Sequence, residues 1–250
     1  MEEYIQIIYN NEFLRKNLLG DDFNLSKDYF EQIDSFDKNS FDSRNLFELK
    51  YDKGYYHLHI CVLLTKSYPF INNYIKLYLD LFPNKVDIVN VNGITPLALS
   101  LMYSKSHSSL STINLLINYG ANINKPNKFG WTPLMQSITN LSCSIDALRL
   151  VLDKGALVDF QDSNGVTALS LASMNTSDND IIDNVKLLLN YNANPNCYPY
   201  GKHITRHFID HRRNVSKECL DTFLKYDSIK KYIETDNIVK EYLIFRECNF

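Results

Sequence analysis

The sequence predicts an all-α protein built from stacked helical repeats, and three observations lead to this fold class. Five of the eight glycines in the 250-residue chain recur at intervals of 35 to 39 residues. A threonine-headed phrase follows three of these glycines, and a leucine-rich segment lies further along each copy. Fixed periods of this length are typical of repeat proteins, in which neighbouring copies bury each other's apolar faces. The periodic glycines are Gly54, Gly93, Gly130, Gly165 and Gly201.

The composition excludes several classes of protein. Hydrophobic residues make up 45% of the chain and charged residues 22%, whereas disordered chains are poor in apolar residues and highly charged. The net charge of −3 disfavours a nucleic-acid binder. Average usage of about 7% would give roughly 17 glycines, so the eight present argue against glycine-rich phosphate loops. No run of about 18 uncharged apolar residues occurs, so we expect no transmembrane helix, and we expect no membrane among the partners.

The first 51 residues are predicted to form helices that cap one end of the repeat stack, because terminal repeats need a polar outer cover. Apolar residues recur there at helical spacing, for example at Ile5, Ile8, Tyr9 and Phe13. A second such group follows within the same region. It comprises Tyr29, Phe30, Ile33 and Phe36.

Each repeat is predicted to begin its first helix in the phrase after the periodic glycine. The phrase reads GITPL from Gly93, GWTPL from Gly130 and GVTAL from Gly165. A threonine hydroxyl can accept a hydrogen bond from a free amide of the first turn, and a proline at the first helical position sacrifices no bond. The third position after the leucine is small in each copy, which suits two closely approaching helices. It is occupied by Cys61, Ser100, Ser137 and Ala172.

A second, leucine-rich helix is predicted in each repeat, over residues 113–117, 148–152 and 185–189. Gly120 and Gly155 follow two of these helices, where a left-handed residue commonly ends a helix. Asn192 stands at the same place in the next copy, and asparagine also tolerates that conformation. Pro83 stands there in the first copy. Since proline cannot adopt a positive φ, we expect that helix to end differently.

Taken together, these features resemble the ankyrin repeat. The shared features are Gly-x-Thr-Pro-Leu, the leucine-rich second helix and a closing phrase Gly-Ala-x-x-Asn/Asp. The last position of that phrase is occupied by Asn124, Asp159 and Asn196, with Asp87 in the worn first copy. The resemblance implies an all-α ankyrin-repeat solenoid, each repeat a helix-turn-helix with a β-hairpin finger, closed by helical caps. We place an N-terminal cap at 1–51, repeats at 52–89, 90–126, 127–161, 162–198 and, degenerate, 199–227, and a capping helix at 228–250.

The repeats depart from the family pattern in length. The family's usual period is about 33 residues, and the excess here falls between the paired helices, at 103–111, 139–144 and 173–180. These segments are rich in Ser, Asn and Asp and are predicted to be loops. Long, worn repeats in a chain rich in Asn, Ile, Lys and Tyr resemble ankyrin proteins of large DNA viruses, such as poxviruses and giant amoebal viruses.

The sequence gives little support for catalysis or a metal centre, and we expect neither cofactor nor metal. His203, His207 and His211 are four residues apart, so a zinc site is an alternative, although no second ligand pair accompanies them. His57 and His59 lie at a helix start, where local hydrogen bonding is the expected role. Phosphate-loop phrases and a Gly-x-Ser-x-Gly turn are absent from the sequence, so an enzyme is a weaker alternative.

The predicted function is non-catalytic protein recognition through the concave face that the resemblance implies. Residues beside the periodic glycines are not needed for the core, so their identity is free to serve recognition. The predicted partner-binding residues are Asn92, Ile94, Lys128, Phe129, Trp131, Asn164 and Val166. The only tryptophan is among them, and aromatic side chains dominate interface energies. Packing of Trp131 over the neighbouring finger is the alternative interpretation.

We expect a monomer that binds a partner protein, which would be a host protein if the chain is viral. We expect no nucleic-acid binding, although Arg206, Arg212 and Arg213 form a local basic group. Five scattered cysteines without a Cys-x-x-Cys pair, and an acidic N-terminus, predict a cytoplasmic location, with the nucleus as an alternative. An adaptor that recruits ubiquitin ligase components is a further alternative, because many poxviral ankyrin proteins carry an F-box-like element at the C-terminus. The tail here lacks a clear form of that element.

Overall fold

The computed structural model describes residues 56–140, 142–174, 179–206, 221–237, 239 and 241. These residues form helices, turns and loops, and no β-strand occurs among them. The chain divides into two compact units. The first unit contains Met1–Ser100 and His107–Ala121, and the second contains Leu101–Ser106 and Asn122–Phe250.

In the first unit, α5 (His57–Leu64) packs against α6 (Ile71–Leu81), and α6 packs against α8 (Leu110–Asn118). A short 3-10 helix, η3 (Pro83–Lys85), follows α6. Side chains tie α6 to α8 at both ends: the Thr112 hydroxyl donates to Asn72 Oδ1 over 2.8 Å, and the Tyr119 hydroxyl donates to Asp80 Oδ1 over 2.6 Å. The first unit is therefore held by apolar packing between helices and by hydrogen bonds at their surface.

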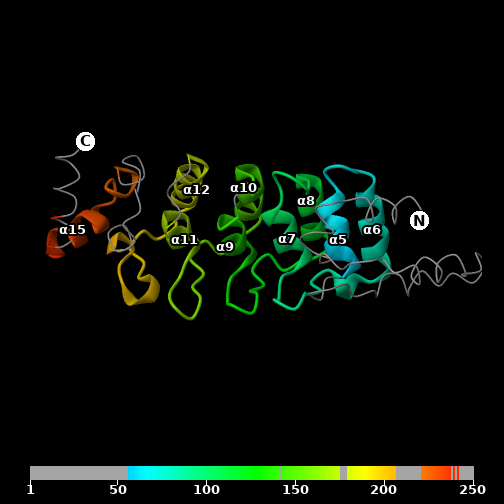
Figure 1. Cartoon of the computed structure of the whole chain (residues 1–250), viewed down its shortest axis with the longest axis horizontal. Helices are drawn as coiled ribbons and strands as arrows, with labels where there is room; N and C mark the ends of the chain where they lie inside the picture. The colour runs from blue at the N-terminus through cyan, green and yellow to red at the C-terminus, as the bar shows by residue number, and fades with distance from the viewer. Residues whose placement is uncertain are drawn as a thin grey trace, which may run out of the picture. The chain divides into compact units, whose positions relative to one another are not determined.

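The second unit repeats the same arrangement. The helix α9 (Pro133–Ile138) packs against α10 (Ile145–Asp153) and α11 (Ala168–Met174), and α12 (Asn179–Asn190) packs against α10 and α11. The loops before α9 and α11, and the 3-10 helix η4 (Pro199–Gly201), extend from the helices on the side away from α10 and α12 (Figure 1). The last helix is α15 (Asp227–Thr235), while α7 (Pro96–Met102) begins in the first unit and ends in the second.

The first helices begin as the sequence predicts. Pro96 and Pro133 are the first residues of α7 and α9. The hydroxyls of Thr95 and Thr132 accept hydrogen bonds from the amides of Ala98 (3.1 Å) and Met135 (3.4 Å). Thr167 accepts from the amide of Ser170 in the same way, over 3.2 Å. Each threonine therefore satisfies one of the amides that a helix start leaves without a partner.

The second helices also end as predicted. Gly120, Gly155 and Asn192 all have positive φ, of 84°, 94° and 62°. At each end two amides bond back into the last turn, for example Gly120 N to Ile117 O and Ala121 N to Leu116 O. This pair of bonds is the Schellman arrangement. Pro83 prevents it after α6, where Phe82 instead takes φ −132° and leads into η3.

The core consists of the inner faces of the helices. Leu97, Leu134 and Leu169, from the recurring phrase, are each at most 1% exposed. The small position of each repeat is buried as well, which is consistent with close approach of helices there. These residues are Cys61, Ser100, Ser137 and Ala172. The two serine hydroxyls donate to the carbonyl oxygens of Leu97 and Leu134, so burying them leaves no polar atom unsatisfied.

The fingers differ from the β-hairpins that the family resemblance implies. Among the described residues they are tight turns closed by one pair of backbone bonds, without a ladder. In the turn 127–131, Asn127 N donates to Trp131 O and Gly130 N donates to Asn127 O, over 2.9 and 3.0 Å. The predicted N-terminal cap at 1–51 lies outside the described residues, and the repeat boundaries remain predictions.

Candidate functional site

The finger turns share one construction. A side-chain oxygen three residues before each glycine accepts two backbone amides across the turn. Asn127 Oδ1 accepts from Phe129 N and Trp131 N over 2.9 and 3.0 Å, and Asp162 Oδ1 accepts from Asn164 N and Val166 N over 2.8 and 3.0 Å. Asn90 does the same in the first unit. The glycines in the turns have φ between 72° and 79°, so each turn needs both an Asn or Asp and a glycine.

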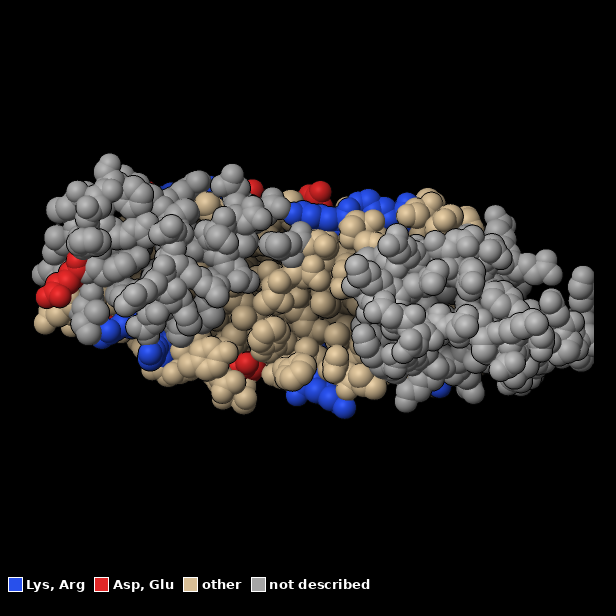
Figure 2. All heavy atoms as spheres, viewed as in Figure 1, with Lys and Arg blue, Asp and Glu red and all other residues tan. Residues whose placement is uncertain are grey.

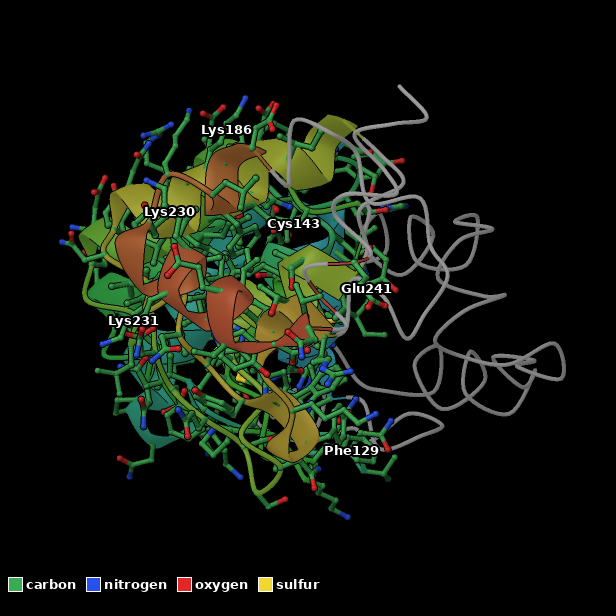
Figure 3. All side chains as sticks on the ribbon, turned by 90° about the vertical axis from the view of Figure 1, so that its left-hand side faces the viewer. Phe129, Cys143, Lys186, Lys230, Lys231 and Glu241 are labelled. Atoms are coloured by element: carbon green, nitrogen blue, oxygen red, sulfur yellow. The ribbon has the colours of Figure 1, made fainter. Side chains whose placement is uncertain are left out.

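The finger 127–131 presents three of the predicted binding residues together. Lys128 and Phe129 are exposed, and Phe129 is the most exposed large hydrophobic residue described, at 68%. Figure 3 shows Phe129 at the end of its loop, pointing away from the helices. Trp131 is half-buried at the base of the turn. This finger therefore offers Phe129 and Lys128 to a partner directly and Trp131 only in part.

Trp131 is tied to the neighbouring finger. Its indole Nε1 donates to Asp162 Oδ2 over 3.1 Å, and its carbonyl oxygen accepts from Gln136 Nε2 over 2.9 Å. Asp162 thus holds its own turn with one oxygen and the preceding finger with the other. Packing of Trp131 over the neighbouring finger is confirmed, and its contact with a partner stays a prediction.

The next finger exposes only one of its two predicted binding residues. Asn164 is exposed, but Val166 is fully buried at 0%. The prediction that the Val166 side chain contacts a partner is therefore wrong. The following segment lies against this turn: Tyr200 N donates to Asn164 O over 2.7 Å, and a Cβ on Gly165 would lie 3.0 Å from Tyr198 O. Val166 leads into α11, and its neighbour Thr167, the N-cap of that helix, is buried beside it.

The two predicted residues of the first unit have different roles. Asn92 is exposed at its finger tip, whereas Ile94 is half-buried. The carbonyl oxygen of Ile94 accepts from His59 Nε2 over 3.0 Å. Ile94 therefore connects its finger to α5, and of these two residues only Asn92 is exposed.

Side chains at the ends of the closing phrase join successive repeats. Asn124 Oδ1 accepts from Leu157 N over 2.8 Å, and Asp159 Oδ1 accepts from Asn194 N over 2.8 Å. Asn196 Oδ1 bonds His203 Nε2 over 2.9 Å. These positions thus hold neighbouring repeats in register and are less free for a ligand.

Three of the histidines that the structure describes, His57, His59 and His203, are buried and take part in the fold. His57 and His59 are buried in α5, and burial lowers the pKa of each to about 4. His203 is 1% exposed, bonds Asn196 and Thr205 through its two nitrogens, and stacks on Tyr232 at 3.7 Å between ring centroids. Burial likewise lowers the His203 pKa to about 4. His207 and His211 lie outside the described residues, which contain no group of three or more His, Cys, Asp or Glu able to hold a metal ion.

The remaining candidate groups are also committed to structure. Arg206 forms an ion pair with Asp236 (Nε to Oδ2, 2.6 Å), so part of its charge is compensated within the protein. Its predicted companions Arg212 and Arg213 lie outside the described residues. Burial raises the pKa of the Cys143 and Cys197 thiols to about 11, which keeps them protonated and poor nucleophiles. A search of the part of the chain that the structure describes finds no helix suited to crossing a membrane.

Sequence reasoning missed the residues that build the turns. Asn90, Asn127 and Asp162 recur at the same intervals as the glycines that follow them, which is a usable signal. Tyr198 and Tyr200 were missed because their repeat has lost the Thr-Pro-Leu phrase. They are 47% and 59% exposed, and Tyr200 has a positive φ of 52°.

Comparison with known proteins identifies the family. A family model described as ankyrin repeats (3 copies) matches residues 58–162 and 101–199, which together cover more than half of the chain. Ankyrin repeat, SAM and basic leucine zipper domain-containing protein 1 of Notamacropus eugenii is 33% identical over 87 residues, or 35% of this chain and 18% of that protein. The protein of the same name from Carollia perspicillata is 33% identical over 89 residues, again 35% and 18%.

A viral relative is also found. An ankyrin repeat protein of Acanthamoeba polyphaga mimivirus is 38% identical over 103 residues, which is 40% of this chain and 61% of that protein. The chain thus aligns with less than two thirds of each of these relatives. The helix pairs, the capped helix starts and the glycine-closed helix ends agree with the family match in the region that it covers. The chain belongs to the ankyrin repeat family.

Proposed function

We propose that this protein is a non-catalytic recognition protein that binds a partner protein through the fingers of its second unit, with Phe129 as the main anchor. Ankyrin repeats are general protein–protein interaction modules, and the family is typically non-catalytic. The relative from a mimivirus supports a viral setting, in which the partner would be a host protein.

The exposure of Phe129 on a firmly held turn carries this proposal. An exposed aromatic ring gains nothing from burial in its own fold, and large exposed apolar side chains often belong to interaction surfaces. The Phe129 amide bonds Asn127, and the adjoining Trp131 bonds Asp162, so the turn is ordered before a partner arrives. Ordering in advance lowers the entropic cost of binding. Aromatic side chains in such positions commonly dominate binding energy.

The test compares partner capture by the wild-type chain and by Phe129→Ala. Tagged full-length protein is expressed in the native cell, and captured proteins are quantified by mass spectrometry. We expect the partner to be reduced at least about tenfold, since an aromatic anchor contributes about 2 kcal/mol or more. Leu77→Ala is the matched control, because Leu77 is a 52% exposed apolar residue on α6, remote from any finger turn in sequence.

Two outcomes would count against the proposal. Equal capture by Phe129→Ala and the wild type, with an unchanged circular dichroism spectrum, would remove Phe129 as the anchor. Equal loss with Leu77→Ala would show that binding does not use the fingers specifically. Cullin-complex subunits that co-purify with the protein regardless of Phe129 would favour the ubiquitin ligase adaptor instead.

A further inference from the structure

The finger tips of the second unit form one continuous row, here called the finger row, from Phe129 through Asn164 to Tyr200. A Cβ on Gly130 would lie 3.4 Å from Asp162 Cβ, which places the first and second fingers in contact. Tyr200 N donates to Asn164 O over 2.7 Å, which joins the second finger to the third. Neighbouring fingers of the row are therefore in contact with each other.

The row has exposed aromatic side chains at both ends and a polar one between them. Phe129 is 68% exposed and Tyr200 is 59% exposed, while Asn164 presents its amide in the middle. Tyr200 adopts φ 52°, a left-handed conformation that is an outlier for a bulky residue. A strained residue of this kind points to a role outside folding. Both ends of the row therefore suit apolar side chains of a ligand.

The row carries more lysine than acidic side chains at its exposed tips. Exposed Lys128 adjoins Phe129, and exposed Lys202 lies two residues after Tyr200. The intervening Asp162 already accepts three hydrogen bonds from the protein. Lysine and arginine spheres appear along the lower edge of Figure 2, with uncharged and some acidic spheres between them, where the finger loops lie in the same view in Figure 1. The row complements acidic residues placed beside apolar ones.

The spacing of the repeats sets the length of the ligand. Packed helices lie about 8–10 Å apart, so fingers two repeats apart are separated by roughly 20 Å. An extended chain rises about 3.3 Å per residue, so roughly six residues span that distance. Side chains six residues apart also point to the same face of an extended chain, because the side-chain period is two.

We infer that the finger row binds an extended, acidic segment of the partner that carries two apolar side chains about six residues apart. One apolar side chain packs on Phe129 and the other on Tyr200, while the amide of Asn164 bonds the backbone between them. Acidic residues beside the Phe129 anchor pair with Lys128. This inference rests on the proposed function and adds the chemistry of the partner.

The experiment uses the full chain as bait for a phage-displayed library of random peptides of about twelve residues, enough to span roughly 20 Å. We expect selected peptides to be acidic, with apolar residues six positions apart, on the same face of an extended chain. An enriched peptide, made with a fluorescent label, should lose at least about tenfold in affinity with Phe129→Ala or with Tyr200→Asn. Asparagine removes the ring at residue 200 and tolerates the left-handed backbone.

The charge component has its own measurement. Lys128→Glu should weaken the labelled peptide several-fold, and affinity should fall as salt concentration rises. Leu77→Ala should leave affinity unchanged. Three outcomes would each overturn the inference. The selected peptides have apolar residues three or four positions apart, no peptide is enriched, or substitution of Phe129 and Tyr200 leaves peptide affinity unchanged.

The experiments distinguish a failure of this inference from a failure of the proposed function. If Phe129→Ala abolishes capture of the cellular partner while peptides ignore the finger row, the function stands and the extended acidic ligand is wrong. If peptides bind as expected but capture does not depend on Phe129, the peptide chemistry stands and the fingers are not the site for that partner.

Discussion

At the scale of single residues, one carboxylate links the two fingers that matter most for recognition. Asp162 Oδ1 closes its own turn by accepting two amides, and Asp162 Oδ2 accepts the indole of Trp131. Asn127 and Asn90 perform only the first of these tasks in their own turns. An aspartate is needed at 162 because its second oxygen must be an acceptor, which an asparagine amide nitrogen is not.

Substitutions at Asp162 should separate the two tasks. Asp162→Asn keeps the amides of Asn164 and Val166 bonded and loses the Trp131 bond, so we expect a loss of about 1 kcal/mol in unfolding free energy. Asp162→Ala also leaves those two amides without a partner, and we expect a loss of about 2–3 kcal/mol. Urea unfolding followed by far-ultraviolet circular dichroism measures both. Equal losses for the two variants would show that the turn does not depend on the Asp162 side chain.

At the scale of elements, the second helices end in the same way whether the closing residue is glycine or asparagine. The amides of Gly155 and Asn192 both donate to carbonyl oxygens in the last turn of their helices, and both residues have positive φ. A Cβ on Gly155 would meet no atom within 4 Å. The difference between the two residues at these helix ends is therefore conformational, without a steric contribution at Gly155.

Exchanging glycine and asparagine at these two helix ends should change the unfolding free energy in opposite directions. Asn192→Gly should raise the unfolding free energy by about 0.5–1 kcal/mol, because glycine adopts the left-handed region at less cost. Gly155→Asn should lower it by a similar amount. Thermal and urea unfolding of the two single variants and the double variant provide the measurement. A gain from Gly155→Asn would contradict this account of the helix ends.

The starts and ends of the helices were the features that the sequence predicted best. Thr95, Thr132, Gly120, Gly155 and Asn192 act locally, so their roles follow from the neighbouring residues alone. The exposure of a side chain, in contrast, depends on residues that are distant in the sequence. Val166 was placed on the binding surface by its position beside a glycine, but in the structure its side chain is fully buried. The extended fingers also lack strands, because the side chains of Asn127 and Asp162 supply bonds that a hairpin ladder would otherwise provide.

At the scale of the whole molecule, each unit is held together by bonds that recur from repeat to repeat. Tyr119 bonds Asp80 in the first unit, and Tyr191 bonds Asp153 at the equivalent place in the second. The turns between paired helices are joined in the same way: Thr65 Oγ1 accepts from the Ser109 amide over 3.2 Å. Stability in repeat proteins is largely a sum of such neighbour terms. Spacing indicated which repeats are neighbours, but not which polar side chains would join them.

Acidification should destabilise the protein through its buried histidines. Between pH 6.5 and about 4 the unfolded chain binds protons at His57 and His59 that the folded chain excludes. Their contribution is therefore complete above pH 6.5 and is lost as the pH falls through this window, by about 1.4 kcal/mol per pH unit for each histidine. Urea unfolding between pH 7 and pH 5 measures the slope.

The His57→Gln/His59→Gln double variant is the control for this slope. Its stability at pH 7 can be lower, but its dependence on pH should be clearly shallower than that of the wild type. A double variant with the wild-type slope would show that other groups, such as His203, account for the acid response.

The hydrogen bond between Trp131 and Asp162 also makes the intrinsic tryptophan fluorescence of the protein sensitive to this site. Trp131 is the only tryptophan in the chain, so all of its indole fluorescence originates at the base of one finger, two residues from Phe129. Indole emission responds to the polarity and hydrogen bonding of its surroundings. A ligand bound to the first two fingers should therefore change the tryptophan emission of the unlabelled protein. A ligand bound elsewhere should leave the emission spectrum unchanged.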